Sequence, residues 1–129
     1  MPLFTKNTSV IELSPVNFDI KNKKIIHPAL NNKKGMIAYM AGWCGHCVRT
    51  SPIYEEVAGT LGGSFPLFFL DCEKYGDFAS KKLNVVGFPT ILYIDRSGKP
   101  YRPYTGNRDT LSMLTDICTE AQVCTRLKK

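Results

Sequence analysis

The sequence predicts an α/β fold with a central mixed β-sheet and helices on both faces. Short apolar runs, at 36–40 and 67–70, are typical of buried strands and alternate with segments of helical period. Two further strand-like segments, 90–94 and 100–104, flank a turn and predict a hairpin. The chain has 129 residues, 43% of them hydrophobic, and no repeat or linker, so we expect one domain over residues 1–129.

The first part of the chain leads to a cysteine-containing motif. Val10–Leu13 is typical of a short strand, and Ser14-Pro15 predicts a helix start with Pro at the first helical position. Residues 21–34 are polar, rich in Lys and Asn, and carry Pro28 within their helical pattern. The buried strand at 36–40 then runs directly into Trp43-Cys44-Gly45-His46-Cys47.

The second part alternates helices and strands. A helix opened by Cys44 is expected to bend at Pro52, continue to Leu61 and end at Gly62-Gly63. A short helix at 77–83 follows the strand at 67–70. The last helix is expected to bury a single apolar stripe, formed by Leu111, Leu114, Ile117, Cys118 and Ala121.

Cys44 and Cys47 are the most informative residues, because they lie one helical turn apart. Side chains three positions apart on a helix have Cβ atoms about 5–6 Å apart, which is close to the reach of a disulfide. The pair can therefore cycle between dithiol and disulfide. Cys44 is the predicted nucleophile, because a helix N-terminus stabilises a thiolate. Cys47, one turn further in, is the predicted resolving thiol, which displaces a partner bound to Cys44.

The neighbouring residues are expected to tune this pair. His46 can donate a hydrogen bond or carry a proton near the thiolate, which would make the disulfide a stronger oxidant. Gly45 keeps the turn compact and leaves the sulfur approachable. Trp43, the only tryptophan, covers one side of the site or serves as a core aromatic, and the two roles are compatible. Arg49 is interpreted as a solvated helix residue in preference to a source of positive potential.

Composition argues against other functional classes. A structural zinc site needs four ligands, and Cys72, Cys118, Cys124 and His27 form no second close pair. The net charge of +6 is scattered in Lys doublets without the pattern of a nucleic-acid motif. No apolar stretch approaches membrane-spanning length. We expect no metal, no cofactor beyond the redox-active Cys44–Cys47 pair, no nucleic-acid partner and no membrane association.

The remaining cysteines are not assigned to the active site. Cys118 and Cys72 are each interpreted as a small buried hydrophobic residue. Cys124 lies six residues after Cys118, on the opposite side of a continuous helix, so a bridge between them requires the helix to end early. Because the chain has five cysteines, at least one thiol stays free or pairs between molecules.

The ends of the sequence give an expectation about location. The first fifteen residues lack the pattern of a secretory signal, and the last residues are not an endoplasmic-reticulum retention sequence. We therefore expect a cytoplasmic protein, or one of the virion or host cell if it is viral. The endoplasmic reticulum is expected only if a signal has been removed.

These features resemble the thioredoxin superfamily, and most closely a catalytic domain of the protein disulfide isomerase family. The matching segments appear in family order and spacing over about residues 8–122: Val10–Leu13, Asn17–Asp19, Trp43–Cys47, Pro52, Leu70–Cys72, Val85–Thr90 and Tyr104–Arg108. The resemblance implies a thioredoxin fold and a thiol–disulfide oxidoreductase or isomerase. It also implies cysteine-containing client proteins as substrates, with glutathione or a thioredoxin-system enzyme as redox partner. The alternative is a thioredoxin-like client-binding module with low turnover.

The same resemblance implies further roles. Pro89 would be a cis-proline facing the cysteine pair, so that the backbone of Phe88 pairs with an extended substrate. Phe88 and Thr90 would flank the site and give an apolar client surface. Arg108 matches an arginine that lowers the pKa of the second cysteine, although a solvated arginine at a helix start explains it equally well.

Two positions depart from the family pattern. The family places a buried carboxylate six residues before the first cysteine, and this chain has Ala38 there. Isomerase domains carry a lysine at the position of Phe69. Replacing both members of a buried charge pair by apolar groups can be neutral for stability. Since the carboxylate is thought to accept the proton of the buried cysteine, we expect Cys47 to resolve mixed disulfides slowly. The turn before Trp43 is also looser, with Ala41-Gly42 in place of Ala-Pro.

Overall fold

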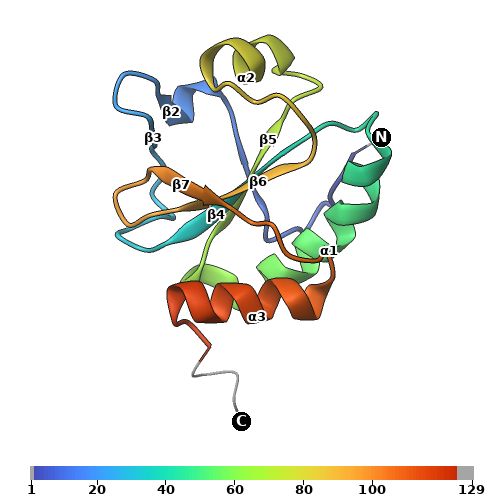
Figure 1. Cartoon of the computed structure of the whole chain (residues 1–129), viewed down its shortest axis with the longest axis vertical. Helices are drawn as coiled ribbons and strands as arrows, with labels where there is room; N and C mark the ends of the chain where they lie inside the picture. Colours follow the sequence, from blue (N-terminus) through green and yellow to red (C-terminus); the bar gives the residue numbers. More distant parts are fainter. Residues whose placement is uncertain (1, 125–129) are drawn as a thin grey trace.

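The computed structural model describes residues 2–124 and confirms the α/β fold around a mixed sheet (Figure 1). The sheet has the strand order β1-β5-β4-β6-β7. Strands β1, β5 and β4 are parallel to one another, whereas β6 and β7 are antiparallel to their neighbours. The strand bounds are β1 Ile11–Leu13, β4 Gly35–Met40, β5 Leu67–Asp71, β6 Thr90–Ile94 and β7 Pro100–Pro103.

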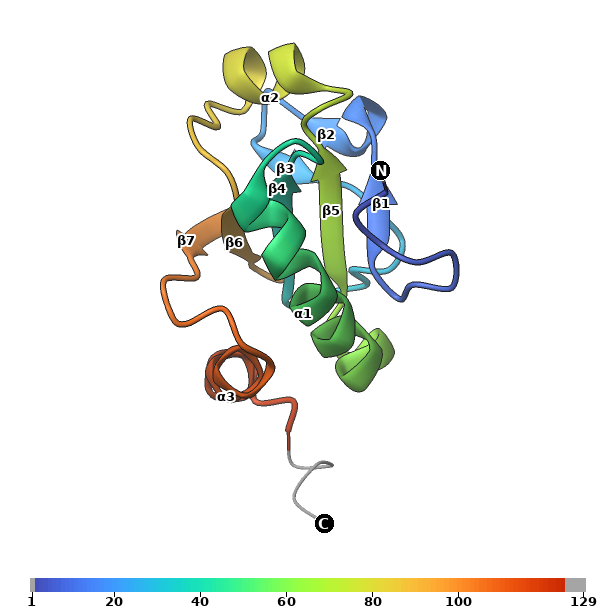
Figure 2. The same cartoon turned by 90° about the vertical axis from the view of Figure 1, so that its right-hand side faces the viewer.

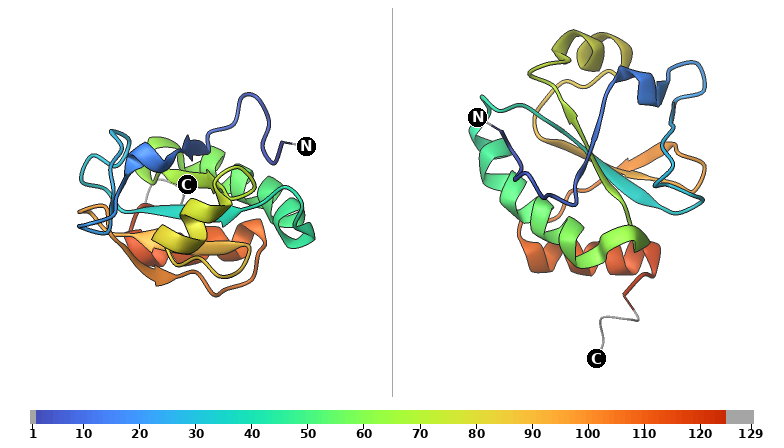
Figure 3. Two further views of the ribbon diagram at one scale, coloured as in Figure 1. Left: turned by 90° about the horizontal axis from the view of Figure 1, so that it is seen from above. Right: turned by 180° about the vertical axis from the view of Figure 1, so that it is seen from behind.

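Helices and a small ribbon cover the two faces of this sheet (Figures 2 and 3). On one face lie α1 (Gly45–Leu61) and α3 (Thr110–Ala121), whose buried residues share one apolar cluster. The residues of α2 (Gly76–Lys82) and of the ribbon formed by β2 (Phe18–Asp19) and β3 (Lys24–Ile25) pack into a second cluster. Within the described part of the chain, no helix has the length and apolar character needed to cross a membrane.

The N-terminal third differs from the sequence prediction. The helix expected at Ser14-Pro15 is only the single 3-10 turn η1 (Pro15–Asn17). The Asn17 side chain accepts a hydrogen bond from the Ser14 N–H and caps the start of this turn, which ends at Phe18, where the backbone is extended and enters the ribbon strand β2. This ribbon, whose second strand β3 lies within the polar segment 21–34, was not predicted. Its strands are two residues each, too short to give a periodic pattern.

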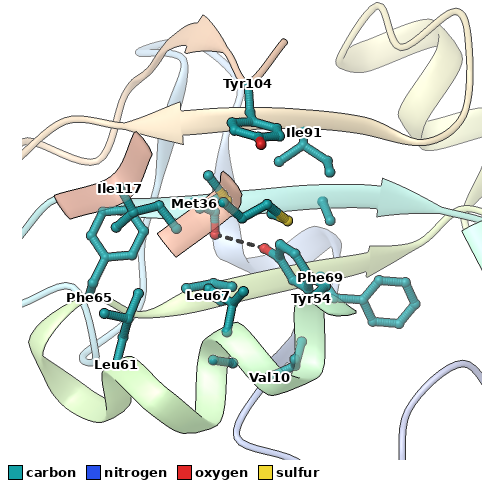
Figure 4. Packing of buried hydrophobic residues seen from close by; sticks show 14 of the residues in the cluster. Val10, Met36, Tyr54, Leu61, Phe65, Leu67, Phe69, Ile91, Tyr104 and Ile117 are labelled. Carbon is teal, nitrogen blue, oxygen red and sulfur yellow. Dashed lines mark hydrogen bonds between the residues drawn. The ribbon is translucent and has the colours of Figure 1, made fainter. Parts of the chain in front are cut away.

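Helix α1 is the element that positions the cysteine motif, and it is anchored by Tyr54. It ends where predicted, at Gly62, whose φ of 57° favours glycine. Tyr54 is fully buried, and its hydroxyl donates to the carbonyl of Phe68 at 2.6 Å and lies 3.3 Å from that of Met36 (Figure 4). The middle of α1 is thereby joined to the backbones of β4 and β5.

The structure of helix α3 differs from two predictions. Leu111 is 75% exposed, and Met113 and Ile117, four residues apart, fill the core instead. The buried stripe therefore passes through Met113 and leaves Leu111 in the first turn of α3 facing solvent. Cys118 is not a free buried thiol either, because it forms a disulfide with Cys124.

The disulfide forms because α3 ends early. Gln122 adopts a left-handed conformation with φ of 56° directly after Ala121. The chain then turns back, and the Cα atoms of Cys118 and Cys124 are 5.0 Å apart. A continuous helix would have placed the two side chains on opposite sides.

The Tyr54 anchor gives a test of stability. Tyr54→Phe is expected to lower the free energy of unfolding by about 1–2 kcal/mol, because two buried strand carbonyls lose a donor. Tyr101→Phe is the matched control: its hydroxyl bonds to Glu120 at the surface, where Tyr101 is 41% exposed, and the expected change is below about 0.5 kcal/mol. Urea denaturation of both variants measures the difference, and equal values would contradict the anchoring role.

Candidate active site

The cysteine motif lies at the junction between the carboxyl end of β4 and the start of α1. The Cys44 N–H donates to the carbonyl of Ala41 at 3.1 Å, and the Cys44 carbonyl accepts from the N–H of Val48 at 3.0 Å. Cys44 is therefore the N-cap residue, outside the helix but aligned with its first turn. Cys44 is half-buried and Cys47 is fully buried, and both are free thiols in this structure.

The surroundings of Cys44 lower the pKa of its thiol. Burial opposes ionisation, but several groups together outweigh it. These groups are the backbone N–H and the thiol of Cys47, the backbone N–H of His46 and the positive charge of Arg49. The helix start thus stabilises a thiolate at Cys44, as the position of the motif predicted.

Cys47 has the opposite environment. Burial raises the pKa of its thiol to about 11, and the backbone of Ala41 and the charge of Arg108 offset only part of this effect. Arg108 is itself exposed, so its guanidinium acts on the buried sulfur from the surface. One thiol of the pair is therefore activated and accessible, and the other is protonated and enclosed.

The His46 side chain contacts Arg49, whereas the backbone N–H of His46 is the group that acts on the Cys44 sulfur. The Arg49 guanidinium lies 2.9 Å from Nδ1 of His46, one helical turn away. Since arginine can only donate, Nδ1 is the acceptor in this contact. Arg49 is exposed, as expected, but it is also part of the site. Its spacing of three residues from His46 and five from Cys44 was the available signal in the sequence.

The loop before β6 faces the nucleophile. The Phe88–Pro89 peptide bond is cis, and the Cys44 sulfur lies 3.7 Å from the Phe88 carbonyl oxygen. The Phe88 ring packs edge to face against Trp43, with ring centroids 5.6 Å apart. At the end of this loop, the Thr90 hydroxyl donates to the carbonyl of Gly87 at 2.5 Å.

The rim of the site is apolar and exposed. Trp43 is 67% exposed and Val86 is 98% exposed, whereas Phe88 is half-buried and packs against the core. Gly45 is exposed beside Cys44, and a Cβ at this position would meet only the Arg49 side chain, at 3.5 Å. The structure therefore brings Trp43, Cys44, Gly45, His46 and Phe88 to one surface, with Pro89 and Thr90 in the adjoining loop.

Ala38 and Phe69, the two positions that depart from the family pattern, lie side by side on neighbouring strands. Ala38 of β4 and Phe69 of β5 are register partners, and both are buried. Phe4 of the N-terminal segment packs edge to face on Phe69, with centroids 4.9 Å apart. An aromatic pair thus occupies the place of a buried charge pair, and among residues 2–124 no carboxylate is one of the main groups that shift the pKa of the Cys47 thiol.

Cys72 is not a member of the redox pair. It is buried in the cluster on the other face of the sheet, and burial raises the pKa of its thiol to about 12, although the charge of Cys47 adds to this rise. Within residues 2–124, no group of three or more His, Cys, Asp or Glu side chains is arranged to hold a metal ion.

Comparison with known proteins places this site in a family. The chain is 35% identical over 109 residues to "Protein disulfide isomerase-like 2-2" of Oryza sativa subsp. japonica, covering 83% of this chain and 28% of that protein. It is 34% identical over 107 residues to "Probable protein disulfide-isomerase A6" of Medicago sativa, covering 81% and 28%. The chain therefore spans less than a third of the length of these relatives.

Solved structures agree on the fold. ERdj5 form II matches with a TM-score of 0.69 and 28% identity, covering 85% of this chain and 14% of that chain. Human ERp44 form I matches with a TM-score of 0.71 and 19% identity, covering 91% and 30%. The thioredoxin family model matches residues 9–119, and the chain therefore belongs to the thioredoxin family and is related to protein disulfide isomerase-like proteins.

Proposed function

We propose that this chain is a thiol–disulfide oxidoreductase acting on protein cysteines through the Cys44–Cys47 pair. The observation that carries the proposal is the contrast between the two thiols. Cys44 is half-buried with a lowered pKa, and Cys47 is enclosed with a raised pKa. A pair of this kind has one sulfur to attack a partner and a second sulfur to release it.

Reduction of a client proceeds in two exchanges. The Cys44 thiolate attacks one sulfur of the client disulfide, so that a Cys44–client bond forms and the other client sulfur leaves as thiolate and takes a proton. Cys47 then loses its proton and attacks the Cys44 sulfur, which closes the Cys44–Cys47 disulfide and expels the second client thiolate. Oxidation of a client dithiol is the reverse sequence. In isomerisation, a second thiolate of the client attacks the client sulfur of the mixed disulfide, which forms a new client disulfide and releases Cys44 as thiolate.

The surface around Cys44 supports a client that is an exposed peptide segment. Trp43, Val86 and Phe88 present apolar side chains beside the nucleophile. The Phe88 carbonyl, next to the Cys44 sulfur, offers an acceptor to the backbone of an extended chain. Cysteine-containing client proteins are the proposed substrates, with glutathione or a thioredoxin-system enzyme restoring the pair.

A client-binding module with low turnover is the second candidate. The observation in its favour is the pairing of Ala38 with Phe69, which leaves Cys47 without a nearby carboxylate to accept its proton. A module of this kind would hold clients as long-lived mixed disulfides with Cys44.

Substitution of the cysteines tests the proposed function directly. Cys44→Ser is expected to reduce the rate of disulfide reduction by at least 1,000-fold, because a hydroxyl cannot replace the thiolate. Cys72→Ala is the matched control and should leave the rate within about twofold, since Cys72 lies on the other face of the sheet. A reductase assay with a protein disulfide and a dithiol reductant measures both rates. If Cys44→Ser turns over as fast as the unsubstituted chain, the proposal fails.

The role of Arg49 can be measured as a pKa. Arg49→Ala is expected to raise the pKa of Cys44, because a positive charge near the thiolate is removed. The pH at which alkylation of Cys44 reaches half its maximal rate should therefore move upward. Arg96→Ala is the control. It also removes one positive charge, but Arg96 contacts the carbonyl of Asn32 and not the active site, so this pH should stay unchanged. An unshifted value in Arg49→Ala would contradict the role.

Release of the client should depend strongly on pH. Cys47 attacks only as thiolate, and its pKa is about 11. The rate of release should rise about tenfold per pH unit between roughly pH 7 and pH 10, because the thiolate fraction rises in that proportion below the pKa.

Acid quenching and mass spectrometry of the Cys44–peptide disulfide measure this rate. At pH 7 a large trapped population is expected, which supports slow resolution. Cys47→Ser provides the control, since its mixed disulfide should persist at every pH. A release rate that is already fast and constant from pH 7 to pH 9 would show that another group accepts the Cys47 proton.

A further inference from the structure

A cavity lies on the face of the sheet opposite α1. It has a volume of about 290 Å³ and is bordered by the β2–β3 ribbon, the end of α2 and the strands β4, β6 and β7. Apolar side chains from different elements line it, among them Phe18, Ile25, Leu83 and Leu92. The size is close to the lower limit for cavities that bind small molecules. The cavity contains none of the residues of the candidate active site.

Tyr39 gives this cavity a polar group. Its side chain lines the cavity and is only 3% exposed, and its hydroxyl, which stays accessible from the cavity, has no protein hydrogen-bond partner among residues 2–124. Every other tyrosine hydroxyl in the buried core has one, such as Tyr54 with Phe68 and Tyr93 with Asp116. Burial raises the pKa of the Tyr39 phenol, so the hydroxyl stays protonated and can donate. Because the hydroxyl is accessible from the cavity, a ligand that accepts its hydrogen bond would take the place of solvent there.

The border of the cavity is positively charged. Lys23 and Lys24 of the ribbon and Lys82 at the end of α2 all line it, and Asp19 is the only acidic residue among the lining residues. None of these lysines is within 4.0 Å of a carboxylate in the described residues. The Asp19 carboxylate is engaged by the backbone and side chain of Asn22. The three ammonium groups are therefore left without a close partner around an apolar cavity.

We propose that this cavity binds a small organic anion with an apolar body and one carboxylate group. The apolar walls would hold the body, the Tyr39 hydroxyl would donate to a carboxylate oxygen, and the lysines at the border would balance its charge. A single carboxylate fits better than a phosphate dianion, because Asp19 lies on the same border and Tyr39 is the only hydroxyl among the lining residues. The site is independent of the chemistry at Cys44 and Cys47.

Octanoate and octan-1-ol form a matched pair of probes, equal in apolar length and different in charge. Titration into the ¹⁵N-labelled protein should show octanoate binding with a Kd at or below about 1 mM. The largest chemical-shift changes are expected at the amides of Tyr39, Leu83 and Leu92. Octan-1-ol should bind at least tenfold more weakly, because it lacks the charge.

Two variants and a control test the assigned groups. Tyr39→Phe should weaken octanoate binding about tenfold, because the hydrogen bond to a charged group is lost. Lys82→Gln should weaken it about two- to fivefold, as expected for a partly solvated charge. Lys81→Gln removes the neighbouring charge, which does not line the cavity, and should change the affinity less than twofold.

Any one of four results would overturn the proposal. The first is the absence of shift changes at these amides up to about 10 mM octanoate. The second is equal binding of octanoate and octan-1-ol, and the third is an equal effect of Lys81→Gln and Lys82→Gln. Shift changes confined to Trp43, Val86 and Phe88 would also overturn it, since octanoate would then bind at the client surface. Because binding is measured without any redox step, loss of the proposed enzymatic activity would leave this result unaffected.

Discussion

The structure depends on the way in which the first turn of α1 is held against the sheet. Cys44 caps the helix through its own carbonyl, so the free N–H groups of the first turn point toward its sulfur. The position of this turn is fixed from two sides. Strand β4 is joined to it by only the short segment 41–44, and Tyr54 joins the middle of α1 to the backbones of β4 and β5. The lowered pKa of the Cys44 thiol therefore depends on the packing of the entire helix.

The same geometry makes the two thiols unequal. A step of three residues along the helix moves a side chain from the edge of the domain into its core, so Cys44 is partly accessible and Cys47 is enclosed. Charges from two separate segments act on them. Arg49 belongs to α1 itself and acts on Cys44, whereas Arg108 precedes α3 and acts on Cys47. The two sulfurs can thus be tuned by different substitutions.

Most of the fold and of the pair could be predicted from the sequence, because the relevant signals are local. The apolar runs at β4 and β5, the glycines after α1 and the spacing of Cys44 and Cys47 each determine structure within a few residues. The remainder depends on contacts that are distant in sequence or on the ends of helices. Leu111 was wrongly predicted to be buried, and the buried Met113 was not predicted, because periodicity alone does not fix where a helix meets the core. The contact of Phe4 with Phe69 joins segments more than sixty residues apart and leaves no pattern.

The disulfide between Cys118 and Cys124 determines which cysteine of the chain is left without a partner. Five cysteines cannot all form disulfides within one chain. When Cys44 pairs with Cys47 and Cys118 with Cys124, Cys72 remains as the free thiol. Because Cys72 is only 4% exposed, this leftover thiol is shielded from other molecules. The fully oxidised protein should therefore form no disulfides between molecules, even though its number of cysteines is odd.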